Sequence, residues 1–278
     1  MTRRTLGQAL AAGVATKLAA ARPQTGKLVP PPGYTVMDMS GLKHFWPAKP
    51  EQIAMLVYPG MTALDLIGPQ QAFGYTMGAK VNLVWKNLDP VVTDTGVKIT
   101  PSATFHDTSE QVDLIFVPGG GKGTVELMGD AEVLGFVAQQ GKGARYVTSV
   151  CSGSLVLGAA GLLRGYRATS HWAVRDVLKT LGAEPAPGRI VEDRNRITAG
   201  GMTAGIDFGL YLVGKLRGEE YGRALELILE YDPHPPFHSG TPAEATPSIL
   251  DFATRMYAPL LKSAQASAEA ARTRWAKA

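Results

Sequence analysis

The stretch YVTSVCSGSLVLGAA, residues 146–160, decides which fold we expect for this chain. Its opening residues are mostly β-branched and suit a buried strand, whereas its closing residues are small or aliphatic and suit a helix. Cys151, the only cysteine in the sequence, lies between the two parts. A sharp turn from strand to helix that carries a nucleophile is a nucleophile elbow. The pattern therefore predicts such an elbow with Cys151 at the turn.

The position of Cys151 at a helix start favours a reactive thiol over an inert one. Unpaired N–H groups and the helix dipole at a helix start lower the pKa of a thiol, and the thiolate is the reactive form. The alternative is a small buried hydrophobe, which is the usual state of a free cysteine. Because the residues around Cys151 fit an elbow, we predict that it is the catalytic nucleophile.

Apolar segments on both sides of this stretch alternate between strand-like and helix-like patterns. The expected strands are residues 53–58, 81–85 and 112–117, a short edge strand at 97–101, and a late pair at 190–191 and 196–200. The expected helices are residues 70–77, 132–140 and 173–181, one that begins near 203, and 219–231. This alternation is typical of an α/β fold, a mainly parallel sheet with helices on both faces.

Ligands of such a sheet bind at the carboxyl ends of its strands. Cys151 follows one expected strand, and the turn PGGGKG, residues 118–123, follows another. The turn fits neither of the common phosphate-binding glycine patterns, but glycine lets backbone N–H groups approach a ligand closely. We expect the N–H groups of Gly120 and Ser152 to form an oxyanion pocket beside Cys151, with Gly121 just outside it. The alternative is a tight strand exit that binds nothing.

Asp65 is the one charged residue in the otherwise apolar segment 63–67. Burial and a nearby thiolate would both raise the pKa of its carboxyl group, which would suit a general acid. The alternative is an N-cap of a helix that begins near residue 68 or 69. His171, which precedes Trp172, could pair with Cys151 for nucleophilic catalysis or be a hydrogen-bonded structural histidine, and the sequence leaves both open.

Composition excludes several classes of function. Hydrophobic residues make up 45% of the sequence and charged residues 19%, which is typical of a globular domain with a large core. The net charge of +4 comes with no basic stripe interleaved with aromatic residues, so we expect no nucleic-acid partner. A single cysteine forms no internal disulfide, and the five histidines show no metal-ligand spacing, so we expect no metal.

The two ends of the chain differ from its middle. Residues 1–21 contain the pair Arg3-Arg4 followed by small and apolar residues, which resembles a twin-arginine leader. If the leader functions, the protein is periplasmic, and otherwise we expect it in the cytoplasm. Residues 22–50 form a Pro- and Gly-rich arm, residues 51–240 the catalytic domain, and residues 241–278 a tail with a docked helix. Beyond the leader, nothing is long and apolar enough to span a membrane.

Three segments together resemble the DJ-1/PfpI superfamily and, within it, the isonitrile hydratase family. They are CSGSLVLGAAGLLRGYRATSHW at residues 151–172, LDLIGP at 64–69, and EYDPHPPF at 230–237. The resemblance covers about residues 51–240. It implies a flavodoxin-like three-layer sandwich with the cysteine at the elbow, and chemistry without a cofactor. We also expect a homodimer.

Isonitrile hydratases add water to an isonitrile and give an N-substituted formamide, using a cysteine and an aspartate. The matching positions are Cys151 and Asp65, with Ser152 where the family usually has threonine. The resemblance thus implies a small-molecule substrate and a thioimidate on Cys151, with Asp65 as acid and base and His171 as an outer neighbour at most.

Other members of the superfamily provide the alternative functions. One alternative is a glyoxalase, deglycase or amide hydrolase, although those enzymes usually have glutamate where Asp65 stands. The other is a redox or ligand sensor that uses Cys151 without turnover. Related transcription regulators add a helix-turn-helix domain, for which the residues after 240 are too few and too rich in alanine.

Overall fold

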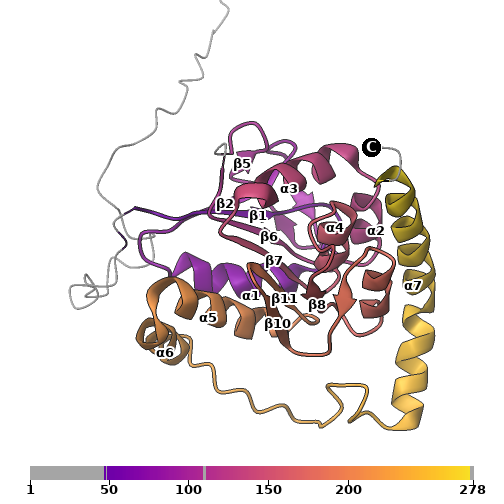
Figure 1. Ribbon diagram of the computed structural model, residues 1–278. Coiled ribbons are helices and arrows are strands. Elements are labelled where there is room, and N and C mark those ends of the chain that lie inside the picture. Colours follow the sequence, from indigo (N-terminus) through magenta and orange to yellow (C-terminus); the bar gives the residue numbers. More distant parts are fainter. Residues whose placement is uncertain (1–46, 48, 109–110, 276–278) are drawn as a thin grey trace, which may run out of the picture.

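The computed structural model describes residues 47, 49–108 and 111–275, so the predicted leader and most of the arm lie outside the described residues. Its centre is a seven-stranded sheet in the order β10-β11-β7-β6-β1-β2-β5 (Figure 1). The strands are β1 (Gln52–Leu56), β2 (Lys80–Trp85), β5 (Ala103–Thr104), β6 (Leu114–Val117), β7 (Tyr146–Val150), β10 (Ile190–Asp193) and β11 (Arg196–Ala199). Neighbouring strands run parallel except β10 and β11, the predicted late pair, which run antiparallel. The predicted α/β fold with a mainly parallel sheet is confirmed.

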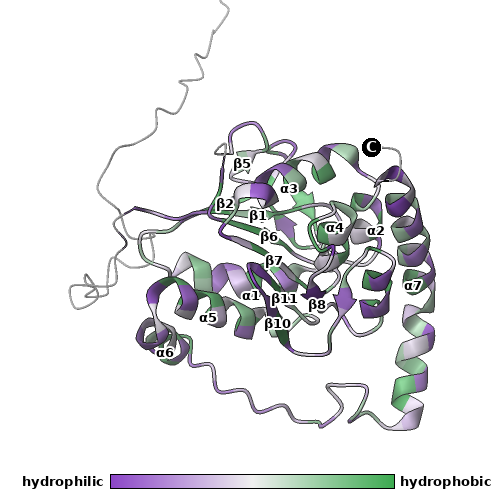
Figure 2. Ribbon diagram, viewed as in Figure 1, coloured by the Kyte–Doolittle hydropathy of each residue, from purple (hydrophilic) through white to green (hydrophobic). Residues whose placement is uncertain are grey.

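The middle of the sheet is buried because helices cover both of its faces. β6 and most of β1 and β7 are buried along their length, as expected for near-continuous apolar strands of a parallel sheet. The helices on one side are α1 (Ala63–Gly74), α5 (Ala204–Arg217) and α6 (Glu219–Ile228). Those on the other are α2 (Lys122–Leu127), α3 (Ala131–Gly143), α4 (Gly153–Ala159) and α7 (Pro247–Trp275) (Figure 1). Figure 2 shows apolar residues concentrated in the sheet and polar ones on the outer helices.

Helices α1 and α5 lie side by side and share a tight contact. A methyl group on Gly205 would lie 3.1 Å from Pro69 Cδ, and one on Gly209 would lie 2.8 Å from Ala72 Cβ. The bare glycine backbone of α5 therefore allows α1 to approach closely. Both helices are also fixed to β6 by three phenylalanine rings whose centroids are 5.6–6.4 Å apart, namely those of Phe73, Phe116 and Phe208.

Two predicted helices differ from the structure. The helix predicted at 70–77 is α1, which begins at Ala63 and includes Pro69. The sequence-based start was wrong because a proline usually ends or begins a helix, whereas packing against α5 keeps Pro69 inside this one. The helix predicted at 173–181 is a short 3₁₀-helix, η3 (Arg175–Lys179). The expected edge strand at 97–101 is β4 (Lys98–Ile99), which pairs with β3 (Val91–Val92) outside the main sheet.

The predicted C-terminal helix is α7, and its C-terminal half holds it on the domain. Ala264, Ala268 and Ala271 are fully buried, and α7 contacts α4, α2 and η3. Small residues at this spacing allow two helices to pack closely. Further small elements that the sequence reading missed are α2 and the paired strands β8 (Arg167–Ala168) and β9 (Glu184–Pro185). Among the described residues, no helix has the length and apolar character needed to cross a membrane.

Candidate active site

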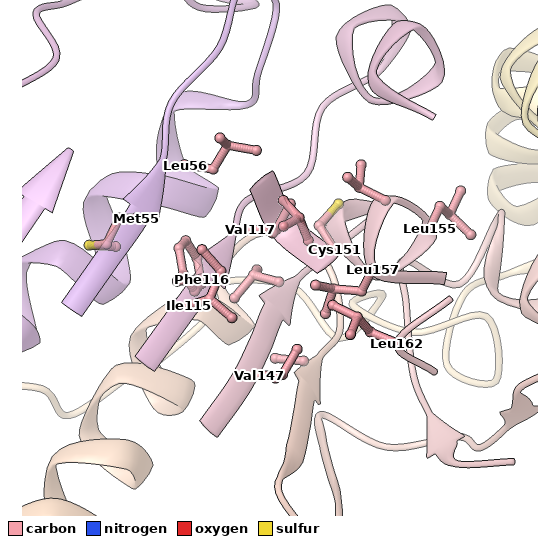
Figure 3. Packing of buried hydrophobic residues seen from close by; sticks show 14 of the residues in the cluster. Met55, Leu56, Ile115, Phe116, Val117, Val147, Cys151, Leu155, Leu157 and Leu162 are labelled. Atoms are coloured by element: carbon pink, nitrogen blue, oxygen red, sulfur yellow. The ribbon is translucent and has the colours of Figure 1, made fainter. Parts of the chain in front are cut away.

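The predicted elbow is formed at the end of β7. The backbone of Cys151 has a φ of 57°, a left-handed conformation that residues other than glycine rarely adopt. Two hydrogen bonds hold it in this conformation, because the Cys151 N–H donates to the carbonyls of Ala199 at 3.0 Å and Gly200 at 2.9 Å. Gly153 then begins α4, where a methyl group would lie 2.2 Å from the Val117 carbonyl oxygen. Figure 3 shows Cys151 at the start of α4, beside Val117.

Asp65 and Cys151 meet across Gly119. A methyl group on Gly119 would lie 2.7 Å from Asp65 Oδ2, from Cys151 Cβ and from the Ser152 backbone nitrogen. Glycine is therefore required there, because any side chain would occupy the space where the carboxyl group and the elbow converge. Asp65 lies in the first turn of α1, whose N-cap is Thr62. The structure thus does not place Asp65 as an N-cap.

Burial dominates the electrostatics of Asp65. The residue is 0% exposed, and neither carboxyl oxygen meets the geometry of a hydrogen bond to a described residue. Burial raises the pKa of this carboxyl group to about 7, although the nearby Cys151 thiol and Gly119 backbone favour the charged form. Asp65 therefore exchanges between its acid and carboxylate forms near neutral pH.

The expected lowering of the thiol pKa is wrong for this structure. Burial raises the pKa of Cys151 well above its usual range, and the Asp65 charge raises it further. The N–H of Ser152 at the helix start does favour the thiolate, as we predicted, but burial is the larger effect. The resting pair consequently consists of a neutral thiol beside a carboxyl group that titrates.

The glycine turn is tied to the elbow by the Ser152 side chain. The Gly120 N–H donates to Ser152 Oγ at 3.0 Å, and the Ser152 hydroxyl lies 2.8 Å from the Gly120 carbonyl and 3.0 Å from Thr124 Oγ1. The Gly120 N–H thus has a partner within the protein, so it is not free to bind an oxyanion as we expected. The Ser152 N–H, the other expected donor, faces the Cys151 sulfur. Nothing lies within 4 Å of a methyl group built on Gly121.

His171 lies beside the elbow as a neutral ring. Its Nδ1 accepts the Ala173 N–H at 3.3 Å, and burial lowers its pKa. A methyl group on Gly201 would lie 2.3 Å from His171 Cδ2, so the ring packs on the turn after β11. The neighbouring Ser170 donates its hydroxyl to the Cys151 carbonyl at 3.0 Å, a contact that no motif signalled.

A model of the DJ-1/PfpI family matches residues 51–215, more than half of the chain. The chain belongs to the DJ-1/PfpI family. Over 211 residues it is 49% identical to the isonitrile hydratase of Pseudomonas putida, an alignment that covers 76% of this chain and 92% of that protein. It is also 30% identical over 184 residues to the HTH-type transcriptional regulator GbdR of Pseudomonas aeruginosa, covering 65% of this chain but 47% of the regulator.

Solved structures agree with the DJ-1/PfpI assignment. The crystal structure of a THiJ/PfpI family protein from Pseudomonas syringae superposes with a TM-score of 0.79 at 46% identity, covering 88% of this chain and 98% of that one. Drosophila melanogaster DJ-1beta, at 21% identity and a TM-score of 0.61, shares the fold. Among the residues that the structure describes, no three His, Cys, Asp or Glu side chains form a group that could hold a metal ion.

Proposed function

We propose that this DJ-1/PfpI protein is an isonitrile hydratase that uses Cys151 as nucleophile and Asp65 as proton carrier. The observation that carries the proposal is the fully buried carboxyl group of Asp65, which meets the elbow at Gly119 and has a pKa of about 7. A group with this pKa both accepts and donates a proton near neutral pH. The 49% identity to the P. putida isonitrile hydratase supports the same reaction.

The first half of the reaction adds the thiol S–H bond across the terminal isonitrile carbon. The Asp65 carboxylate takes the proton of the Cys151 thiol and passes it to that carbon, while the sulfur forms a bond to the same carbon. The product is a neutral thioimidate, R–N=CH–S, on Cys151, and Asp65 is again a carboxylate. Because the thiol pKa is high, transfer of its proton to Asp65 must accompany the attack of the sulfur.

The second half adds water and releases the thiol. Asp65 accepts a proton from water as its oxygen bonds to the thioimidate carbon, and then donates that proton to the nitrogen. The resulting R–NH–CH(OH)–S intermediate loses its hydroxyl proton to Asp65 as the C–S bond breaks, which gives the N-substituted formamide. The sulfur regains its proton from Asp65. The Ser152 N–H, which faces the sulfur, stabilises the charge on the departing thiolate.

The test of this proposal is the hydration of cyclohexyl isocyanide by the purified full chain. We expect stoichiometric conversion to N-cyclohexylformamide, followed by chromatography or by the formyl proton signal. Failure to form formamide, together with turnover of methylglyoxal, would replace the hydratase with a glyoxalase. Absence of turnover with both substrates, together with ready oxidation of Cys151 by dilute peroxide, would favour a sensor.

The pH dependence of kcat/KM is expected to follow Asp65. Below its pKa of about 7, Asp65 is protonated and cannot accept the thiol proton, so kcat/KM should rise with pH until about 7 and then level off. Burial keeps the Cys151 thiol neutral, so we expect no second rise near the usual thiol pKa of about 8.5. Initial rates at low substrate across the pH range measure this profile. A profile that is flat through neutrality and rises near 8.5 would show instead that a free thiolate limits the rate.

A further inference from the structure

Three aromatic rings from distant parts of the chain meet next to the elbow. His171 and Trp172 precede η3, and Tyr257 comes from α7. The Tyr257 ring lies 4.7 Å from the His171 ring and 5.7 Å from the Trp172 ring, measured between centroids. The C-terminal helix thus contributes a side chain to this region, although it lies beyond residues 51–215, which match the family model.

This aromatic group lies close to the buried sulfur. Cys151 is 5% exposed, and the His171 ring packs on Gly201, next to the Gly200 carbonyl that accepts the Cys151 N–H. The Tyr257 ring contacts the His171 ring and is partly exposed, whereas His171 is buried. Burial raises the pKa of the Tyr257 phenol, and so do the charges of Cys151 and Asp65, which places the phenol within electrostatic reach of both groups.

The position of Tyr257 is set by contacts farther along α7. The Gln265 amide donates to Thr180 Oγ1 at 3.0 Å, and the Trp275 indole N–H donates to the Ala159 carbonyl at 3.2 Å. Tyr257 therefore extends from a helix that is anchored on its C-terminal side. Its neighbour Met256 is 55% exposed and provides a matched control on the same helical turn.

We propose that Tyr257 determines the size of the substituent that can reach Cys151, as the outer wall of the site formed with His171 and Trp172. This inference rests on the proposed function for the identity of the substrate, an isonitrile R–NC whose group R meets the wall. An aromatic wall of this kind accepts a compact hydrocarbon group and excludes a wider one by steric contact. The geometry thus assigns a role in selectivity to α7, in addition to its docking on the domain.

The experiment compares a small and a wide substrate in matched variants. We expect Tyr257→Ala to raise the ratio of kcat/KM for 1-adamantyl isocyanide to that for ethyl isocyanide by roughly tenfold, because pocket contacts of this size change discrimination by that order. Tyr257→Phe keeps the ring and Met256→Ala changes an exposed neighbour, so both should leave the ratio within about twofold of wild type. A packing role alone would lower the unfolding temperature and leave the ratio unchanged.

A second readout does not require turnover. Because the sequence has one cysteine, intact-mass analysis of alkylation reports access to Cys151 alone. We expect Tyr257→Ala to accelerate labelling by N-cyclohexylmaleimide more than labelling by iodoacetamide, and Met256→Ala to change neither. Tyr257→Leu replaces the alanine variant if that one does not fold.

The outcomes of the two readouts separate the two proposals. Inactive wild-type protein with a changed labelling ratio in Tyr257→Ala would overturn the hydratase and retain the wall. An active enzyme whose substrate ratio and labelling ratio are both unchanged in Tyr257→Ala would overturn the wall and retain the hydratase.

Discussion

Replacement of Cys151 by alanine is expected to abolish formamide formation, with a loss of about 10⁴-fold or more in kcat. The covalent thioimidate requires the sulfur, and no other cysteine is present in the sequence to replace it. Alanine keeps the Cβ and thus the same strain at the left-handed φ of 57°, so the variant should fold. Rates with cyclohexyl isocyanide and the unfolding midpoint of both proteins measure the two effects.

Two further variants test whether the loss of activity in Cys151→Ala is due to the missing sulfur. Cys151→Ser keeps a smaller nucleophile that is far less reactive, so we expect it to be nearly as inactive as the alanine variant. Ser154→Ala removes a hydroxyl that lies 3.3 Å from the Cys151 carbonyl oxygen on the first turn of α4, and it should keep most of the activity. Turnover within tenfold of wild type in Cys151→Ala would eliminate the covalent step from the mechanism.

Replacement of Asp65 by asparagine is expected to reduce kcat by about 10²- to 10⁴-fold, the usual contribution of general acid–base catalysis. Asparagine has nearly the same shape but neither accepts the thiol proton nor delivers it to carbon. The residual rate should also lose its inflection at pH 7. Single-turnover rates on cyclohexyl isocyanide measure the loss, and Asp113→Asn provides a control at a carboxylate that accepts the Gln52 N–H at the start of β1.

The same Asp65→Asn change is expected to stabilise the fold at alkaline pH. Because burial raises the folded-state pKa from 3.8 to about 7, the folded protein holds this proton more tightly than the unfolded chain. Wild-type stability therefore falls as pH rises from about 4 to about 7, by about 4 kcal/mol from this group. Denaturant midpoints should favour the asparagine variant at pH 8 and converge near pH 4. A variant that is less stable than wild type at both pH values would argue against a desolvated carboxylate.

Local sequence patterns predicted the parts of the site that depend on neighbouring residues. The elbow at Cys151 follows from a strand-like segment joined directly to a helix-like one, and both form as expected. Asp65 stands out locally as a charge in an apolar segment, and the family resemblance pairs it with Cys151. The two residues do meet at Gly119.

The parts that the sequence reading missed depend on contacts between distant segments. The thiol pKa was predicted in the wrong direction because the helix start is visible in the sequence, whereas the burial of Cys151 beside Asp65 is not. The partner of the Gly120 N–H is a serine hydroxyl from the elbow, which no spacing in the glycine turn reveals. Tyr257 reaches His171 only because α7 returns to the domain, and its helical pattern indicates only that one face is apolar.

The tight contact between α1 and α5 has a consequence for how this protein can evolve. α1 carries Asp65, the proposed acid. α5 begins just after the turn whose Gly200 carbonyl accepts the Cys151 N–H. The contact between the two helices at Gly205 and Gly209 therefore helps to position Asp65 relative to Cys151. A side chain at Gly209 would force α1 or α5 to shift, and one at Gly205 would crowd Pro69, on the helix that carries Asp65. Selection for new substrates is thereby directed away from α1 and α5. Divergence among descendants of this sequence should accumulate on α7, where changes leave the reacting pair in place.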